Sequence, residues 1–201
     1  PKLSYLFSRR SIRSYQQRDV SDDLVHDLLS AAMAAPSAVA KDPWAFVVVQ
    51  DEAIRQQVAQ HAAYYFIRWA HVEEAPLLIV LCGNAHNRIY RQFLHEDIGL
   101  AGSQIMLQAK ALGLGTCWLG GLDREAIADV LKLPEHIEVI GLLTVGFPAE
   151  EPDLTPRKPL SEIVHYDVYG NLEKSKSATP GQATGGLLKN LLRRLRVSFR
   201  P

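Results

Sequence analysis

Apolar and polar positions alternate along the chain in a way that predicts helices and strands in succession. The first helix is indicated by Ser21 as an N-cap, by acids in the first turn and by apolar residues three to four positions apart, and Pro36 ends it. Helices are predicted over 21–35, 52–72, 96–112 and 124–132.

Four short runs rich in apolar and branched residues predict strands. They cover 44–49, 76–82, 116–119 and 138–146. The first two lack polar alternation, which is typical of strands buried on both faces of a sheet. Strands that alternate with helices indicate a layered α/β or α+β domain around a central sheet.

The helix over 96–112 is rich in small residues, including Gly99 and Gly102. Small side chains permit another helix or backbone to approach closely, so this helix is expected to be the spine of the core. Gly113 and Gly115 end it.

Composition indicates an ordinary globular protein. The chain has 201 residues, 47% apolar and 22% charged, enough for one domain with a substantial core or for one domain plus an appendage. No apolar run approaches the length of a membrane span, and no secretory signal is apparent, so we expect a cytoplasmic protein. Cys82 and Cys117 lie in apolar strands and are expected to be buried, unpaired thiols. No metal-ligand spacing occurs.

Charge separates the end of the chain from the rest. Residues 171–201 hold seven basic residues and one acid, a net charge of +6, which leaves −6 on residues 1–170. We therefore predict a folded domain over 1–170, followed over 171–201 by a flexible linker and a basic amphipathic helix. That helix has three interpretations: packing across a second subunit, which we favour, contact with an anionic membrane surface, or service as a docking peptide.

The run Ser8-Arg9-Arg10-Ser11-Ile12-Arg13-Ser14 places three guanidiniums and three hydroxyls within seven positions. Arginine keeps its charge and presents fixed donors, so such a cluster suits a phosphate or another planar anion. The alternative is a solvated basic turn.

The common enzyme motifs are absent from the sequence. There is no Gly-rich dinucleotide fingerprint, phosphate loop or nucleophile elbow. A nucleophilic pair of Cys117 with a histidine is disfavoured, because a thiol in an apolar strand is usually inert. We expect no catalytic side chain and no metal. The protein either takes its chemistry from a cofactor or only binds a ligand.

Four segments carry a resemblance to a known family. They are Arg9-Arg10-Ser11-Ile12-Arg13, Ala35-Pro36-Ser37-Ala38 with Pro43-Trp44, Trp118-Leu119-Gly120-Gly121 and Arg157-Lys158-Pro159-Leu160. In this order, and over about residues 4–169, the chain resembles the nitroreductase family of FMN-dependent oxidoreductases. The resemblance implies an α/β (α+β) three-layer sandwich, with a central mixed β-sheet flanked by helices and a C-terminal extension swapped between the subunits of a dimer.

The resemblance also implies where FMN binds. Arg9 and Ser11 would hold its phosphate together with Arg157, Arg13 would lie at the pyrimidine edge of the flavin, and Arg10 would make contacts nearby. A doubly negative phosphate needs such fixed donors.

Other segments of the family pattern would approach the flavin ring. Gly120 and Gly121 would allow close approach of the backbone, with an amide donor for the flavin N5, although glycines after a strand are also ordinary turn formers. Pro36-Ser37-Ala38 would contact the flavin bound mainly by the other subunit of a homodimer. Lys158 would assist at the phosphate or be solvated.

The chain departs from the family pattern in the long helix, which has Ser103 and Gln104 where an Asn is common, and in one loop. Asn and Gln are common where this chain has Ala40 and Asp42, and Asp42 could repel an anionic ligand. The aromatic cluster over 64–69 could stack on a planar substrate or pack in the core or a dimer interface.

The resemblance implies an FMN-dependent oxidoreductase. It would use NADH or NADPH to reduce nitroaromatic, quinone or similar acceptors by ping-pong hydride transfer. One alternative is an FMN-binding protein with little turnover, acting as a sensor, reservoir or partner-binding module. Another is a specialised flavin-processing or dehalogenating relative. Nucleic-acid binding is not expected, because the basic tail has one aromatic residue and no reading motif.

Overall fold

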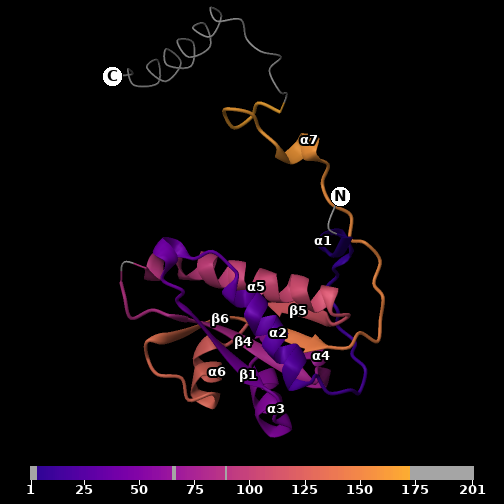
Figure 1. The fold of residues 1–201 in the computed structure, drawn as a ribbon, viewed down its shortest axis with the longest axis vertical. Coiled ribbons are helices and arrows are strands. Elements are labelled where there is room, and N and C mark those ends of the chain that lie inside the picture. Colours follow the sequence, from indigo (N-terminus) through magenta and orange to yellow (C-terminus); the bar gives the residue numbers. More distant parts are fainter. Residues whose placement is uncertain (1–3, 65–66, 89, 173–201) are drawn as a thin grey trace, which may run out of the picture. The chain divides into compact units, whose positions relative to one another are not determined.

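The computed structural model describes residues 4–64, 67–88 and 90–172 (Figure 1). The chain divides into two compact units, Pro1–Leu154 and Thr155–Pro201, and each is described by itself. The linker and basic helix predicted for the C-terminal segment lie outside the described residues from position 173 onward. The domain boundary predicted at residue 170, and the swapped extension beyond it, stay predictions.

A four-stranded sheet forms the centre of the first unit, in the order β1-β4-β6-β5. The strands are β1 (Trp44–Val49), β4 (Leu77–Asn84), β6 (Ile137–Gly146) and β5 (Gly115–Leu119). All three pairings are antiparallel. The family resemblance predicts a mixed sheet. Within the described residues, its parallel pairing is the isolated bridge between Ser11 and Thr116.

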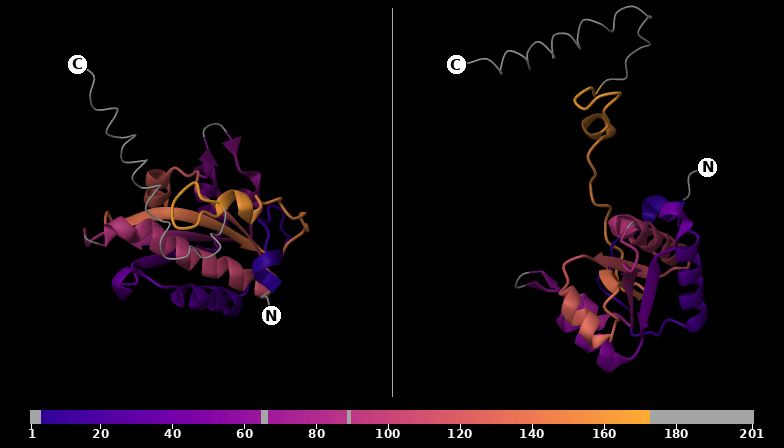
Figure 2. Two further views of the ribbon diagram at one scale, coloured as in Figure 1. Left: turned by 90° about the horizontal axis from the view of Figure 1, so that it is seen from above. Right: turned by 90° about the vertical axis from the view of Figure 1, so that its left-hand side faces the viewer.

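Helices cover both faces of this sheet (Figure 2). One face carries α2 (Asp22–Met33) and α5 (Leu94–Ala111), and the other carries α3 (Glu52–Gln60), α4 (Ala70–Glu74) and α6 (Arg124–Val130). Each face has its own apolar cluster: Leu28 and Ile105 pack on one, and Val58 and Ile127 on the other. The predicted α+β three-layer sandwich is confirmed.

Shorter elements complete the described part of the chain. They are α1 (Ser4–Ser8), the 3₁₀ turns η1 (Ala38–Ala40) and η2 (Arg91–Phe93), the two-stranded sheet of β2 (Ala63–Tyr64) and β3 (Ile67–Arg68), and α7 (Leu160–Ile163) in the second unit. Among the described residues, no helix is long and apolar enough to cross a membrane.

Two sequence-based predictions are wrong, one of a helix and one of the burial of a strand. The helix predicted over 52–72 ends at Gln60, and the β2–β3 hairpin follows. The aromatic and branched residues there lose rotamer freedom in a helix and favour strands. In addition, β1 is half-buried along most of its length rather than buried on both faces, because it is an edge strand of the sheet.

At one position of α5, Gly102, a small residue permits the close approach that the sequence predicts. A Cβ built on Gly102 would lie 2.4 Å from Cζ3 of Trp118, and one on Gly141 of β6 would lie 2.7 Å from Cζ2 of the same ring. The indole of Trp118 thus fills a slot between α5 and the sheet that only glycine leaves open. At Gly99 the space is open, with nothing within 4 Å.

Candidate functional site

The arginine-rich segment runs along the open edge of the sheet, beside β5. The amide of Ile12 donates to the carbonyl of Thr116 at 3.0 Å, and farther along that of Gln16 donates to the carbonyl of Phe147 at 2.9 Å. Ile12 and Tyr15 are buried while Arg13 between them is exposed. The segment is therefore held as an extended strand that turns its apolar side chains inward and presents Arg13 outward.

Tyr15 is the internal anchor of this segment. Its hydroxyl donates to the carbonyl of Ile12 at 2.7 Å and lies 2.6 Å from Oγ1 of Thr144 in β6. Burial raises the pKa of Tyr15 well above its ordinary value, so the side chain stays a neutral donor. It ties the segment to the centre of the sheet.

A carboxylate from the far end of the domain fixes the turn at Arg13. The backbone amides of Arg13 and Ser14 both donate to Oε1 of Glu150, the latter at 3.1 Å. The sequence gives no signal for this contact, because Ser14 and Glu150 lie 136 positions apart. Glu150 thereby sets the direction in which Arg13 leaves the backbone.

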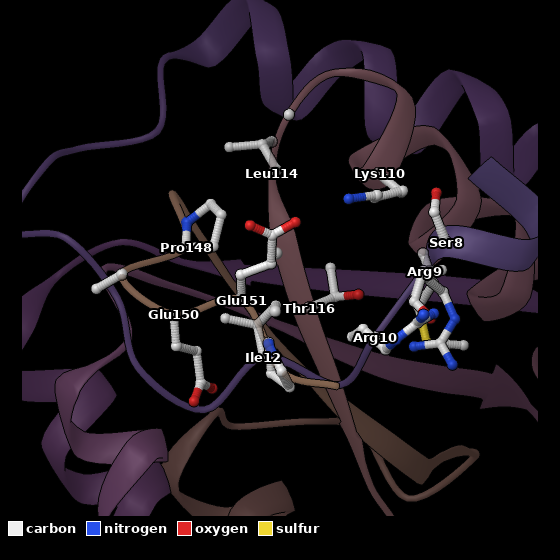
Figure 3. A pocket seen from close by; sticks show the side chains of 15 residues that line it. Ser8, Arg9, Arg10, Ile12, Lys110, Leu114, Thr116, Pro148, Glu150 and Glu151 are labelled. Carbon is white, nitrogen blue, oxygen red and sulfur yellow. The ribbon is translucent and has the colours of Figure 1, made fainter. Parts of the chain in front are cut away.

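A cavity of about 510 Å³ opens beside the first two arginines (Figure 3). Arg9, Arg10 and Lys110 of α5 bring three positive charges to it, and Glu150 and Glu151 bring two carboxylates. Arg10 bonds the carbonyls of Phe7 and Arg9 at 2.9 Å through Nη1, and its buried Nε has no partner among the described residues. Its guanidinium groups are the part of the lining suited to an anion, while the two carboxylates oppose one.

Gly120 and Gly121 directly follow the last residue of β5. Gly120 is exposed, and its carbonyl accepts from Nη2 of Arg124 at 3.1 Å. A Cβ there would meet, within 4 Å, only Nε1 of Trp118 at 3.9 Å, and the backbone is not in the left-handed region. The fold of this chain therefore does not require glycine at position 120. The flavin contacts that the family resemblance implies for Gly120 and Gly121 stay a prediction.

The Pro36-Ser37-Ala38 segment lies at the other end of α5. The amide of Ala38 donates to Oδ1 of Asp97 at 2.9 Å, and Asp97 is in the first turn of α5, whereas Lys110 is in its last. Thirteen residues of helix separate these two positions by about 20 Å. A single chain does not bring the two groups of predicted flavin contacts together.

The loop from Ser37 to Asp42 is strained and internally bonded. Val39, Ala40 and Asp42 have φ of 54°, 49° and 46°, in the left-handed region that costs about 1–2 kcal/mol for most residues. The hydroxyl of Ser37 donates to Oδ1 of Asp42 at 2.7 Å, and the amide of Asp42 donates back to Oγ of Ser37 at 3.0 Å. Asp42, a departure from the family pattern, thus closes the loop on itself.

Arg157 and Lys158 belong to the second compact unit, where both are exposed. Their predicted part in binding the phosphate stays a prediction.

The two cysteines are free and buried, as the sequence predicts. Burial raises the pKa of Cys82 to about 12 and also raises that of Cys117, which the charges of Arg13 and Arg9 and a bond to Ser11 partly offset. A nucleophile would need the opposite shift. Within the described residues no group of side chains could hold a metal ion.

We expect both thiols to be inert toward DTNB in the native protein at pH 8, because the reagent needs thiolate. In denaturant both should react at once. Absorbance of the released thiolate measures the two rates, and fast modification of the native protein would contradict the burial seen here.

His71 of α4, which from the sequence could meet the phosphate of a nicotinamide cofactor, is a buried imidazole. Burial lowers its pKa, the charge of Arg13 adds to this, and Glu150 opposes it. The ring is therefore neutral near the surface from which Arg13 emerges.

The three-layer fold carries a cavity lined by arginine, lysine and glutamate side chains at the edge of its sheet. The family model for the nitroreductase family matches residues 6–67 and 59–147. The chain belongs to the nitroreductase family, and the resemblance noted in the sequence is confirmed.

Individual relatives agree with this. A Methanothermobacter thermautotrophicus protein, named for NADH dehydrogenase or NAD(P)H nitroreductase activity, is 36% identical over 154 residues, covering 75% of this chain and 78% of the relative. The oxygen-insensitive NADPH nitroreductase of Salmonella typhimurium is 27% identical, with coverages of 87% and 77%. The solved NADPH:FMN oxidoreductase of Vibrio harveyi in complex with NAD⁺ matches with a TM-score of 0.76 and 26% identity, covering 85% of this chain and 79% of that structure.

Proposed function

We propose that this protein transfers hydride from NAD(P)H to a nitroaromatic, quinone or similar acceptor by a ping-pong reaction on bound FMN. The observation that carries the proposal is the cavity lined by Arg9, Arg10 and Lys110, formed on the segment from which Arg13 also emerges. The flavin supplies the hydride chemistry, and the protein supplies binding, orientation and positive charge.

The predicted enzyme class and cofactor are confirmed at the level of the family. Relatives of this chain are named as an NADPH-flavin oxidoreductase and as FMN reductases that use NADPH or NAD(P)H. This chain is accordingly an FMN-dependent NAD(P)H oxidoreductase. The acceptor and the order of its steps belong to the proposal.

The residues present fit an FMN phosphate. By the family resemblance, Arg9 and Ser11 would hold it, and Arg157 and Lys158 would assist. The buried Nε of Arg10 has no partner among the described residues. Arg13 would lie at the pyrimidine edge, where its charge favours the negative charge of the reduced ring. No described side chain is needed as an obligatory acid or base, because solvent can supply protons at an open site.

The position of the Pro36-Ser37-Ala38 segment supports a site shared by two chains. Since this segment and the arginine cavity lie at opposite ends of α5, two copies related by a two-fold axis would place the segment of one beside the cavity of the other. Exposed apolar side chains near the first turns of α5 favour such an interface. They are Val39, Phe93 and Leu100.

Purified protein tests the proposal directly. We expect a yellow protein whose flavin absorbance is bleached anaerobically by NADH or NADPH and restored by an acceptor. A colourless protein with no affinity for added FMN would exclude the proposal. A yellow protein that neither reductant bleaches would instead favour the alternative of an FMN-binding protein with little turnover, which the departures at Ala40 and Asp42 suggested.

Subunit mixing tests whether the site is shared. Arg9→Ala removes a cavity cation, and Ala38→Glu puts a carboxylate on the opposite loop, so each variant alone should bind FMN poorly. Co-expressed, they should recover FMN in about a quarter of the sites, because half of the dimers are mixed and each has one intact site. FMN content per chain measures this. No recovery on mixing would place both groups in a site built by one chain.

A further inference from the structure

We propose that Asp97 and Asp42 are positioning residues that lock the loop from Ser37 to Asp42 in the conformation in which it meets the flavin of a second subunit. This inference rests on the function proposed above. Neither carboxylate touches the ligand in this proposal. Each acts through the backbone or side chain of a loop residue.

Asp97 is a charged residue on the apolar side of α5. It is 4% exposed and lies one helical turn from Leu94 and Ala101, both buried in the core. Burying a carboxylate is costly unless its oxygens are bonded. The bond from the amide of Ala38 to Oδ1 gives it a partner, while Oδ2 has none among the described residues. Among the described residues, the bond to Ala38 is therefore the contact through which this carboxylate acts on the loop.

Asp42 closes the loop by two bonds to Ser37, one in each direction. The bonds commit the hydroxyl proton of Ser37 to Asp42, so this hydroxyl can offer a ligand only its oxygen. They also hold Asp42 at a φ of 46°. The carboxylate that could have repelled an anionic ligand is instead an acceptor within the loop.

Apolar packing does little to hold the loop. Val39 is 70% exposed although its branched side chain disfavours the left-handed conformation that it adopts. Ala40 and Asp42 are exposed as well and are in the same region. Polar bonds to the two carboxylates therefore offset the strain. Without them the loop would relax to ordinary backbone angles and move the Ser37 and Ala38 backbone.

Conservative and disruptive variants separate this role from general stability. Asp42→Ala and Asp97→Ala remove the acceptor oxygen. Asp42→Asn and Asp97→Asn keep an oxygen that can accept from Ser37 or Ala38 and remove only the charge. Ile127→Val serves as a control, because it weakens the core at α6, outside the loop.

The experiment measures FMN dissociation constants by fluorescence titration and the unfolding of the apoprotein by urea. We expect each Ala variant to bind FMN about 5- to 50-fold more weakly, less than for direct loss of a charged contact to the ligand because these residues act through the loop, and each Asn variant to stay within about 3-fold of wild type. Ile127→Val should unfold earlier yet keep its FMN affinity. Asp42 is exposed, so Asp42→Ala keeps the test valid if Asp97→Ala does not fold.

The possible failures are distinguishable. Wild-type protein without affinity for FMN would overturn the proposed function itself. Wild-type affinity in Asp42→Ala, or in a folded Asp97→Ala, would overturn the assignment of that residue alone. Equal losses in the Asn and Ala variants would show that charge near the flavin, rather than loop geometry, is what these residues supply, and this too would overturn the inference.

Discussion

Replacing Arg13 by alanine should weaken FMN binding by about 10- to 100-fold, the range for losing a charged hydrogen-bonding group from a site. The backbone of Arg13 is fixed by Glu150, so the loss should come from the guanidinium rather than from a moved chain. Anaerobic reduction of the remaining bound flavin by NAD(P)H should also be slower, because the negative charge of the product loses its partner. Stopped-flow absorbance at saturating FMN measures this rate.

Arg18 offers a matched control for Arg13. It is exposed, lies on the same segment, and stacks 3.7 Å from the centre of the Phe147 ring, away from the cavity-lining residues. Arg18→Ala should leave both FMN affinity and flavin reduction unchanged. Wild-type behaviour of Arg13→Ala in both measurements would contradict the role proposed for Arg13.

Gly102→Ala should lower the free energy of unfolding by about 1–3 kcal/mol, the usual cost of overpacking a filled core. The added methyl would overlap both Cζ3 of Trp118 and, at 2.8 Å, Cδ1 of Leu81. Gly99→Ala in the same helix should instead raise it by about 0.5–1 kcal/mol, because the space is open and alanine favours helix. Urea unfolding of the two apoproteins measures both. Equal effects of the two variants would contradict the slot described for Trp118.

Local signals were enough to predict most of the elements. Ser21 precedes α2, Pro36 follows it, and Gly113 follows α5, so residue types near each boundary mark where the helix begins or ends, although the side chain of Ser21 makes no capping bond. The hairpin after α3 was missed because the helical spacing of its residues was weighed above the strand preference of its aromatic and branched side chains. The edge position of β1 could not be predicted either, since strand order is not encoded in any one strand.

The candidate site was only partly predictable for the same reason. The arginine cluster is visible in seven consecutive residues, but the contact of Glu150 with its backbone joins distant parts of the chain. Lys110 reaches the cavity only because α5 ends beside the N-terminal segment. Asp97 did leave a signal, as a single acid on an apolar helix face, which is unusual enough to be singled out in advance.

The length of α5 has a consequence for how the protein would hold its cofactor. If each flavin contacts the first turn of α5 in one subunit and the last turn of α5 in the other, then ligand binding and subunit association are linked equilibria. Dilution would release FMN, and added FMN would draw separated chains together. The yellow colour of a sample would then report its concentration as well as its purity.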